Sequence, residues 1–378
     1  MKQYDVAVVG SGPAGATAAR ELALQGVSVA LLEKEVLPRH KVCGGGIVFR
    51  ARAMLDFDIS PVVRSECHSA TLSLAKSGVT FKATRDDPIV SMVMRSEFDQ
   101  LLVEKACSAG AELLEECCVE SALFQDEAVE LQTSHGKIRA KFIIAADGAT
   151  STMARLAGWK RLDRLTPALE CELSVSASDY ERFGDSARFD FDMPANGYGW
   201  VFPKGDHLGV GIGGFGPGDC KADLKKELRA YLHKLQLSLP EQQKVYGYVI
   251  PLLPRQGGFA RRRVFLVGDA AGLADPMSAE GISGAIISGR LAASALVSAK
   301  LDAVKSEEIY EEELAKILLP ELEASRKLAS LFYSSQTLRK WLLKHYGRRL
   351  TDKVADIFMG NACYSDYADA FLRKMKLK

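Results

Sequence analysis

The sequence predicts an α/β protein in which a parallel-sheet region is interrupted by an antiparallel sheet and followed by a helical C-terminal segment. Three observations predict this class. Residues 4–32 contain two apolar strand-like runs, separated by a glycine-rich turn and a helix-like stretch that implies parallel pairing. Residues 168–250 consist mostly of strand-like segments. From residue 301 the pattern is helical and charged.

The composition excludes several classes of protein. A length of 378 residues allows two or three domains, and a net charge of +1 argues against nucleic-acid binding. No apolar run approaches the roughly 20 residues that span a bilayer. Because the first strand begins near Met1, we expect no signal peptide. The eight cysteines form no C-x-x-C pair or Cys/His cluster, which predicts reduced thiols in the cytoplasm and no metal site.

The first element is a strand at residues 4–9 that leads into the run G-x-G-x-x-G. Gly10 permits the tight turn, Gly12 allows backbone to approach a pyrophosphate, and Gly15 allows the following helix to pack closely on the sheet. The helix N-terminus offers N–H groups to phosphates. A second strand, residues 28–32, ends at Glu33, whose carboxylate can accept hydrogen bonds from ribose hydroxyls. We therefore predict a Rossmann-like dinucleotide site.

A loop with three consecutive glycines follows the second strand. Residues 34–41 are basic and interrupted by proline, and Cys43-Gly44-Gly45-Gly46 come next. Such a run favours neither helix nor strand. Two interpretations remain open: a flexible surface loop, or a segment that places Cys43 beside a flat bound ring.

Residues 71–148 alternate between strands and one helix. We expect Ser96 to cap that helix, and Arg95 stands at the preceding strand-to-helix corner. Asp147-Gly148 follows an apolar strand as a turn. The predicted strands are a hairpin at 71–74 and 79–83, a strand at 89–94, and a three-stranded excursion at 111–124, 128–133 and 137–144.

The second sheet carries an aromatic stripe. In a strand over residues 198–203, Tyr198, Trp200 and Phe202 project to one face and build an apolar wall. Core packing is the alternative interpretation. The next strand, LGVGIGG, is rich in glycine, which is typical of close approach by ligand or backbone.

A third glycine-rich segment follows the strand at 263–267. Asp269 ends that strand and can bond polyol or ribose hydroxyls, and Gly281-Ile282 open a helix whose free N–H groups can stabilise negative charge on a reduced ring. A purely structural strand-turn-helix is the alternative.

The helical segment from residue 301 contains LRKWLLKHYGRRL at 338–350, with Trp341 and Tyr346 among basic residues. This composition fits an anionic membrane surface, and a solvated helix packed on the body of the protein is the alternative. The tail, AFLRKMKLK, repeats the pattern.

Four motifs stand in order: the N-terminal strand-turn-helix-strand, Arg95 in RSEFDQLL, Asp147-Gly148, and GDAAGLADP followed by GIS. Together they resemble the FAD-dependent para-hydroxybenzoate hydroxylase fold over residues 1–300. CGGG and GYGWVFP narrow the resemblance to the geranylgeranyl reductase family, which includes isoprenoid-lipid and chlorophyll-side-chain reductases. The resemblance implies a discontinuous FAD-binding domain (1–70, 88–165, 260–300), an inserted antiparallel-sheet substrate domain (71–87, 166–259) and a C-terminal helical segment (301–378).

The resemblance also implies roles for individual residues. Cys43 would be catalytic, and Tyr198, Trp200 and Phe202 would line a prenyl cavity. The residues implied to bind FAD are Gly10, Gly12, Ala14, Gly15, Glu33, Lys34, Cys43, Gly44, Gly46, Arg95, Val119, Asp147, Gly148, Asp269, Gly281 and Ile282.

The first functional hypothesis is a flavin-dependent reductase of isoprenoid C=C bonds, with a hydride from reduced flavin and a proton from a group such as Cys43. An unconjugated alkene accepts hydride poorly, so placement and exclusion of water matter. The substrate is then a prenyl lipid, and the enzyme is cytoplasmic or associated with the inner face of the membrane. NAD(P)H and ferredoxin both remain open as donors, as do the number of bonds reduced and the oligomeric state.

Three alternatives stand beside this hypothesis. A flavin monooxygenase or halogenase shares the fold, but halogenases carry W-x-W-x-I-P, where Tyr198 and Phe202 stand in this sequence. An electron-transfer flavoprotein acting on quinone would need iron–sulfur ligands, for which there is no cysteine cluster. A flavin-stabilised lipid-binding protein without turnover is the non-enzymatic alternative.

Overall fold

The computed structural model describes residues 1–215 and 223–368. The chain folds into two compact units, each made of three segments. Unit 1 comprises Met1–His40, Ser96–Leu165 and Pro251–Leu322, and unit 2 comprises Lys41–Arg95, Thr166–Ile250 and Glu323–Lys378. The tail AFLRKMKLK, residues 370–378, lies outside the described residues.

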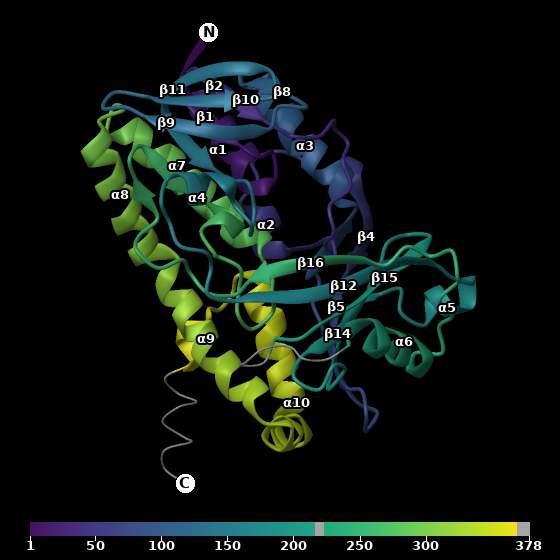
Figure 1. Cartoon of the computed structure of the whole chain (residues 1–378). Coiled ribbons are helices and arrows are strands. Elements are labelled where there is room, and N and C mark those ends of the chain that lie inside the picture. Colours follow the sequence, from purple (N-terminus) through teal and green to yellow (C-terminus); the bar gives the residue numbers. More distant parts are fainter. Residues whose placement is uncertain (216–222, 369–378) are drawn as a thin grey trace. The chain divides into compact units, whose positions relative to one another are not determined.

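Unit 1 is built on a mixed sheet in the order β17-β18-β11-β1-β2-β8, and β10 and β9 extend it from β11. Figure 1 labels β1, β2 and β8 to β11 of this sheet. The neighbours of β1 are parallel to it, as predicted, and β9, β10 and β11 form an antiparallel extension. Its strands are β1 (Lys2–Val9), β2 (Val29–Leu32), β8 (Glu112–Leu114), β9 (Val119–Phe124), β10 (Val129–Thr133), β11 (Gly136–Ala145), β17 (Ala260–Arg261) and β18 (Val264–Leu266).

Two local predictions in this region are wrong. The strand predicted at 111–124 is divided into β8 and β9, because the chain turns at Glu116, which has a left-handed φ of 52°. Ser96 does not cap its helix, because the helix begins one residue earlier, at Arg95.

The helices of unit 1 pack closely on one another. A Cβ built on Gly289 of α7 would lie only 2.4 Å from the carbonyl oxygen of Ala14 in α1, so this contact requires glycine. The helices are α1 (Pro13–Leu24), α3 (Arg95–Ser108, whose first residue belongs to unit 2), α4 (Thr152–Leu156), the 3₁₀ turn η2 (Gly268–Ala270), α7 (Ile282–Ser298) and α8 (Ala303–Ile317).

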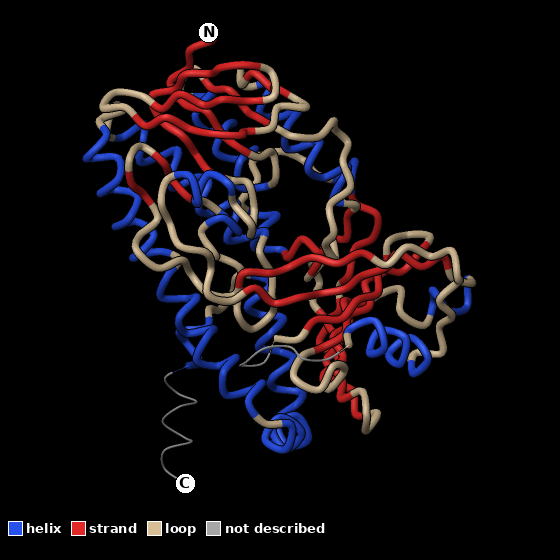
Figure 2. Tube along the Cα trace, viewed as in Figure 1, coloured by secondary structure: helices blue, strands red, loops and turns tan. Residues whose placement is uncertain are grey.

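Unit 2 contains two sheets, drawn in red in Figure 2. The larger has the order β16-β12-β15-β14-β13-β5-β6, and the smaller has the order β3-β7-β4. The predicted hairpin is confirmed as the antiparallel pair β5 and β6. The strands are β3 (Gly46–Val48), β4 (Val63–Cys67), β5 (Ser69–Leu74), β6 (Val79–Thr84), β7 (Val90–Val93), β12 (Leu165–Ser174), β13 (Ser186–Phe191), β14 (Tyr198–Pro203), β15 (His207–Gly213) and β16 (Tyr246–Pro251).

Helices cover the larger sheet of unit 2. Tyr231 of α6 packs under Gly199 of β14, and Gly347 of α10 leaves room for the Phe81 ring of β6. The helices of unit 2 as a whole are α2 (Phe49–Ala53), the 3₁₀ turn η1 (Ser60–Val62), α5 (Ala177–Glu181), α6 (Leu224–Lys234), α9 (Leu319–Ser334, which begins in unit 1) and α10 (Gln336–Met359). No helix in the described residues is both long and apolar enough to cross a bilayer.

The compact units divide the chain differently from the predicted domains, since they group residues 41–95 with the larger sheet and residues 251–259 with unit 1. A unit defined by close packing is not a domain defined by independent folding. The predicted domain boundaries therefore stay a prediction.

A fully buried ion pair joins α10 to the large sheet of unit 2. The Arg339 Nε and Nη2 atoms donate to Asp192 Oδ1 at 2.9 and 2.5 Å, and both side chains have no exposed surface. Arg339 also donates to the carbonyl oxygens of Phe332 and Ala195. These hydrogen bonds satisfy the Arg339 guanidinium. Removing either Arg339 or Asp192 would leave the other charge buried without its partner, at a large desolvation cost.

We predict that Arg339→Met lowers the free energy of unfolding by about 3–5 kcal/mol, because it leaves the Asp192 carboxylate buried without its cation. Arg339→Met combined with Asp192→Asn should recover part of that loss. Arg326→Met, which breaks an exposed pair with Glu323 on α9, should cost about 0–1 kcal/mol. Urea denaturation followed by circular dichroism measures all three, and equal losses for Arg339→Met and Arg326→Met would contradict the assignment.

Candidate functional site

The glycine-rich turn after β1 is held by contacts that exclude side chains. Gly10 has a φ of +102°, and a Cβ on it would lie 2.4 Å from the carbonyl oxygen of Ala146. A Cβ on Gly15 would lie 1.9 Å from the carbonyl oxygen of Gly10. Gly10 is therefore required by the backbone that follows β11, and Gly15 by the backbone of the turn itself, as the G-x-G-x-x-G pattern predicts.

Gly12 differs from its two neighbours. It is the N-cap of α1, no side chain caps that helix, and the nearest atom to a Cβ at this position would be Arg39 Nη2 at 4.0 Å. The protein itself thus leaves space at the N-terminus of a 12-residue helix. An uncapped N-terminus with open space beside it fits a phosphate group.

Glu33 is buried in a network of charged partners at the end of β2. Its Oε2 accepts hydrogen bonds from Ser11 Oγ at 2.5 Å and Arg39 Nε at 3.0 Å. Arg39 also donates to the fully buried carboxylate of Asp99 at 3.1 Å. Burial alone would raise the pKa of Glu33, but the Arg39 guanidinium and the Ser11 hydroxyl hold that pKa below its ordinary value. Glu33 is thus an ionised acceptor beside the glycine turn, whereas Lys34 is exposed.

Asp147 and Gly148 lie directly against the glycine turn, since a Cβ on Gly10 would approach the Cα of Asp147 to 3.1 Å. The Asp147 carboxylate accepts from Ser151 Oγ and from the Met153 amide at 2.9 Å, and so fastens the start of α4. Desolvation of this enclosed carboxylate raises its pKa. Val119 opens β9, two residues after Cys117, whose amide donates to the Glu33 carbonyl at 2.8 Å.

The third motif, which comprises η2 and the start of α7, packs against the same glycine turn. Gly268 lies so close to Ala14 that its Cβ would be 3.1 Å from that of Ala14, and a Cβ on Gly281 would lie 3.4 Å from Asp269 Oδ1. Ile282 is the first residue of α7 and is buried. The expectation that the first N–H groups of α7 are free is wrong for Ser283, whose amide donates to Glu280 Oε1 at 2.8 Å.

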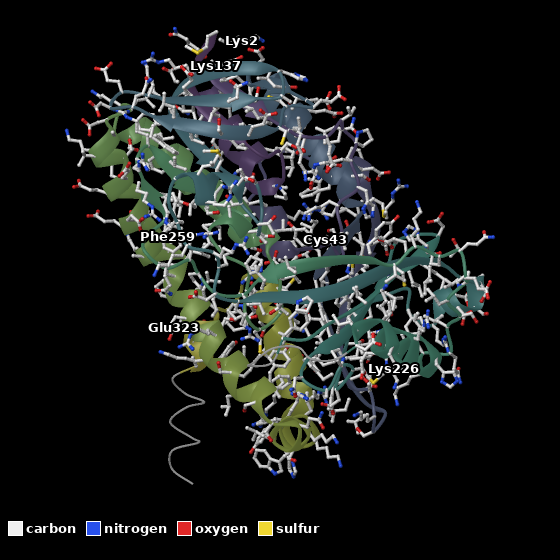
Figure 3. The ribbon with its side chains drawn as sticks, viewed as in Figure 1. Lys2, Cys43, Lys137, Lys226, Phe259 and Glu323 are labelled. Atoms are coloured by element: carbon white, nitrogen blue, oxygen red, sulfur yellow. The ribbon has the colours of Figure 1, made fainter. Side chains whose placement is uncertain are left out.

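The loop after β2 enters unit 2 at Lys41, and two of its glycines lie against an aromatic ring. Cys43, labelled in Figure 3, is partly exposed, and its sulfur accepts the Gly45 amide at 3.5 Å. A Cβ on Gly44 would lie 2.8 Å from Phe202 Cε2, and a Cβ on Gly46 would lie 3.5 Å from the same atom. The flat group that Gly44 and Gly46 accommodate within unit 2 is therefore the Phe202 ring, whereas Gly45 faces the carbonyl oxygen of Val93 and the Lys204 side chain.

Tyr198, Trp200 and Phe202 share one face of β14, as predicted. Their ring centroids are 6.1 Å apart for the first pair and 6.5 Å for the second. The glycines of β15 leave room for these side chains, because a Cβ on Gly211 would lie 2.1 Å from Trp200 Cζ2. The buried Trp200 Nε1 has no hydrogen-bond partner in the described part of the chain, and a Cβ on Gly44 would lie 3.4 Å from it. The wall thus combines apolar rings with one unpaired donor beside the cysteine loop.

A buried group of charges lies next to this wall. The Lys204 ammonium, which is 1% exposed, donates to Glu172 and lies 3.7 Å from Glu170 Oε1. Glu172 Oε2 lies 3.3 Å from His207 Nε2. We call Glu170, Glu172, Lys204 and His207 the Lys204 cluster.

The charged groups of the Lys204 cluster shift one another's pKa values. Burial, reinforced by the charge of Glu172 and opposed by Lys204, raises the pKa of Glu170 to about 7. Burial would lower the pKa of Lys204, but the two carboxylates raise it. The hydrogen bond to Glu172 raises the pKa of His207. The cluster therefore holds a positive charge at Lys204 and a carboxyl group that exchanges its proton near neutral pH.

The predicted residues thus gather in two sets. Unit 1 brings the turn, Glu33, Asp147, Asp269 and Gly281 together, and unit 2 brings the cysteine loop to the aromatic wall. Arg95 is buried at the start of α3 in unit 2, where its charge acts on Glu170.

The sequence analysis did not identify Arg39, Asp99 or the Lys204 cluster. One signal was available, because Glu170 and Glu172 occupy one face of a strand whose other face, at residues 169, 171 and 173, is apolar.

Comparisons with known proteins support a flavin enzyme. A family model described as an FAD binding domain matches residues 3–188. Digeranylgeranylglycerophospholipid reductase 1 of Methanopyrus kandleri is 33% identical over 305 residues, which are 75% of this chain and 78% of that protein. Geranylgeranyl diphosphate reductase of Rhodobacter capsulatus is 30% identical over 286 residues, 74% of this chain and 71% of that protein. An uncharacterised protein of Methanosarcina barkeri is 32% identical over 289 residues, 76% of this chain and 72% of that protein.

Solved structures confirm the predicted fold class. A geranylgeranyl bacteriochlorophyll reductase-like protein from Thermoplasma acidophilum has a TM-score of 0.77 at 25% identity, covering 94% of this chain and 92% of that one. The flavin-dependent brominase Bmp2 has a TM-score of 0.74 at 20% identity, with 100% of each chain covered, and so shares the fold.

The domain match, the uncapped helix N-terminus at Gly12 and the acidic end of β2 agree on one cofactor, and the protein is an FAD-dependent oxidoreductase. The resemblance inferred from the cysteine loop and the GYGWVFP strand is confirmed by the identity to the Methanopyrus and Rhodobacter enzymes. This chain belongs to the geranylgeranyl reductase family.

Proposed function

We propose that this protein reduces C=C double bonds of a geranylgeranyl-type prenyl lipid. The observation that carries the proposal is the packing of Gly44, the residue after Cys43, onto Trp200 and Phe202 of the aromatic wall of β14. A prenyl chain is apolar throughout and matches such a surface. The Methanopyrus and Rhodobacter relatives are named for reductions of geranylgeranyl groups, which supports the same substrate class.

The residues of this chain divide the work. Bound FAD, reduced by an external donor such as NAD(P)H or ferredoxin, supplies the hydride. Glu33, Asp269 and the turn at Gly12 are proposed to hold the cofactor in unit 1. Tyr198, Trp200 and Phe202 are proposed to align the alkene and to exclude water, which an unactivated acceptor requires. The Cys43 Sγ–H bond breaks as its proton joins the second alkene carbon.

An anaerobic single turnover tests the function. The protein is reduced with dithionite and mixed in turn with geranylgeranyl phospholipid, geranylgeranyl diphosphate and menaquinone, and the products are weighed by mass spectrometry. We expect a gain of two hydrogens per reduced bond on a prenyl chain, together with flavin reoxidation. No mass gain in the anaerobic mixtures, together with an oxygenated product when air is admitted to the reduced protein, would instead assign the protein to the monooxygenase or halogenase branch.

We predict that Cys43→Ala slows single-turnover alkene reduction at least a hundredfold, since a positioned general acid is worth roughly 10²–10⁴ in rate. Cys118→Ala, at an exposed cysteine of unit 1, is the matched control and should react as the unmodified protein does. Retention of full single-turnover reduction by Cys43→Ala would remove Cys43 from the mechanism.

We predict that Gly12→Ala raises the dissociation constant for FAD at least tenfold, a loss of about 1.4 kcal/mol, because the added methyl group would occupy the space left for a phosphate. The melting temperature without FAD should be unchanged, since nothing in the described protein lies nearer than 4.0 Å. Gly15→Ala should lower that melting temperature, because its methyl group meets the Gly10 carbonyl. Titration by flavin fluorescence and thermal melting separate the two effects, and unchanged affinity in Gly12→Ala would exclude the phosphate site.

We further propose that α10 contacts an anionic membrane surface. Leu342 and Leu343 are buried, whereas Trp341 is 39% and Tyr346 42% exposed, with ring centroids 5.7 Å apart. Residues 344, 348 and 349 of the same helix are exposed and basic. Exposed aromatic rings among basic residues suit the headgroup region of an anionic bilayer.

We predict that Trp341→Ala combined with Lys344→Gln reduces sedimentation with phosphatidylglycerol vesicles at least fivefold, since each basic residue near such a surface contributes about 1 kcal/mol. Lys327→Gln on α9, also an exposed lysine, should sediment as the unmodified protein does. Neutral phosphatidylcholine vesicles should retain little of either protein. Equal sedimentation of the double variant and the control would exclude α10 as the contact.

A further inference from the structure

The Lys204 cluster is not explained by the stability of unit 2 alone. An ammonium and two carboxylates in a nearly dry setting cost several kcal/mol each to desolvate, and a packed apolar group could replace them. The hairpin of β14 and β15 meets β12, which is distant in the chain, to build the cluster, because β15 lies between β12 and β14 and Glu172 pairs with Gly209. A Cβ on Gly209 would lie 3.1 Å from Lys204 Nζ, so this glycine gives the ammonium its path across the sheet.

The inner end of the cluster touches the cysteine loop. A Cβ on Gly45 would lie 3.4 Å from Lys204 Nζ, and the amide of the same Gly45 donates to Cys43 Sγ at 3.5 Å. The ammonium and the thiol are therefore neighbours of one residue. The charge of Cys43 is also among the influences that raise the pKa of Lys204.

The outer end of the cluster reaches solvent. His207, whose side chain is 17% exposed, lies at ion-pair distance from Glu172. Its other ring nitrogen, Nδ1, is 2.7 Å from Asp206 Oδ1, and the Asp206 side chain is 94% exposed. A continuous series of titratable groups thus leads from water to the buried ammonium.

We propose that the Lys204 cluster is a proton relay that reprotonates Cys43 after each double-bond reduction. This proposal rests on the proposed function, in which each reduction removes the proton of the Cys43 thiol. In the relay an Nζ–H bond of Lys204 breaks, the proton joins the thiolate sulfur, and Lys204 accepts a proton from a carboxyl group of the cluster. That carboxyl group is Glu170, which regains its proton from Glu172 through Lys204. Glu172 takes that proton from the imidazolium of His207, which lies 3.3 Å away and takes a proton from water. One proton enters from solvent for each alkene reduced, and no oxidant or reductant is consumed.

The acid strengths favour a concerted transfer over a stepwise one. An ammonium whose pKa is raised by two neighbouring carboxylates is a weaker acid than an ordinary thiol, so Lys204 alone does not drive the transfer. Coupling the transfer to Glu170 makes its free-energy change favourable, since a carboxyl group with a pKa of about 7 is a stronger acid than an ordinary thiol, whose pKa is about 8.5. Glu170 lies 3.7 Å from Lys204, so a small movement of the side chain brings them into hydrogen-bond contact.

The first test measures the thiol itself and needs no turnover. Iodoacetamide alkylation of Cys43 is followed at one pH by mass spectrometry of its peptide in the full-length protein. Lys204→Met should slow it about tenfold, because the ammonium that stabilises the thiolate is gone. Lys204→Arg keeps the charge and should react at a rate close to that of the unmodified protein. Lys82→Met, which breaks an exposed ion pair with Asp185 in the same sheet, is the matched control and should change the rate less than twofold.

The second test compares the first turnover with later ones. The ratio of the later rate to the first rate should fall at least tenfold in Lys204→Arg, because a guanidinium does not release a proton. His207→Ala should lower the same ratio, and added imidazole should restore it. A cluster that only supported the fold would change both rates together, and imidazole would not act.

The outcomes are distinct. An unchanged alkylation rate in Lys204→Met, or an unchanged rate ratio in both Lys204→Arg and His207→Ala, overturns the relay while prenyl reduction stands. If the unmodified protein reduces no prenyl chain in the single-turnover assay, the proposed function fails and the relay falls with it, even where Lys204→Met slows alkylation. Should Lys204→Met not fold, the Lys204→Arg ratio and the imidazole rescue decide the question.

Discussion

Close approach of backbone at glycine positions is the constraint on which both units depend. In unit 1 the carbonyl oxygens of Gly10, Ala14 and Ala146 occupy the places where side chains would stand on Gly15, Gly289 and Gly10. These three contacts draw β1, α1, β11 and α7 to one point. A single added methyl group at any of them would force the two backbones apart, which close-packed interiors do not absorb without cost. The motif residues are therefore near one another because the backbone is, and not because their side chains attract.

Close approach at glycine positions also shapes unit 2, where side chains instead of backbone fill the space. Its glycines make room for rings and for one ammonium, since Gly44 faces Phe202, Gly211 faces Trp200 and Gly209 faces Lys204. Bulky side chains on β14 can thus lie flat over neighbouring backbone instead of standing away from it. The result is a wall with an apolar stretch and a charged end. An apolar stretch suits binding of a hydrocarbon chain, and a charged end suits proton transfer, so one strand and its neighbours carry both properties.

The sequence analysis succeeded where the signal is local. The turn at Gly10–Gly15, the end of β2 at Glu33 and the common face of Tyr198, Trp200 and Phe202 each depend on residues within one or two elements, so periodicity and glycine spacing were sufficient. It failed where the outcome depends on strand order. The predicted strand at 111–124 breaks because β8 joins β2 in the parallel sheet while β9 pairs with β10, and no pattern inside the segment requires that division.

The Lys204 cluster shows the same limit for chemistry. Its residues come from β12, from the turn after β14 and from the start of β15, and the order β12-β15-β14 alone makes them neighbours. In the sequence they read as ordinary charges of a surface strand and a turn, and only the sheet reveals that water is largely excluded from Lys204. Exclusion of water changes the energetics of these charges. A charge pair that contributes little to stability in water is costly to bury, and burial strongly shifts the pKa values of both groups. Under the proposed function, a thiol that gives up a proton in each turnover beside an apolar substrate could not regain it from bulk water without admitting water to the substrate. A buried series of acids and bases meets both requirements, since protons move along it while the apolar wall stays dry.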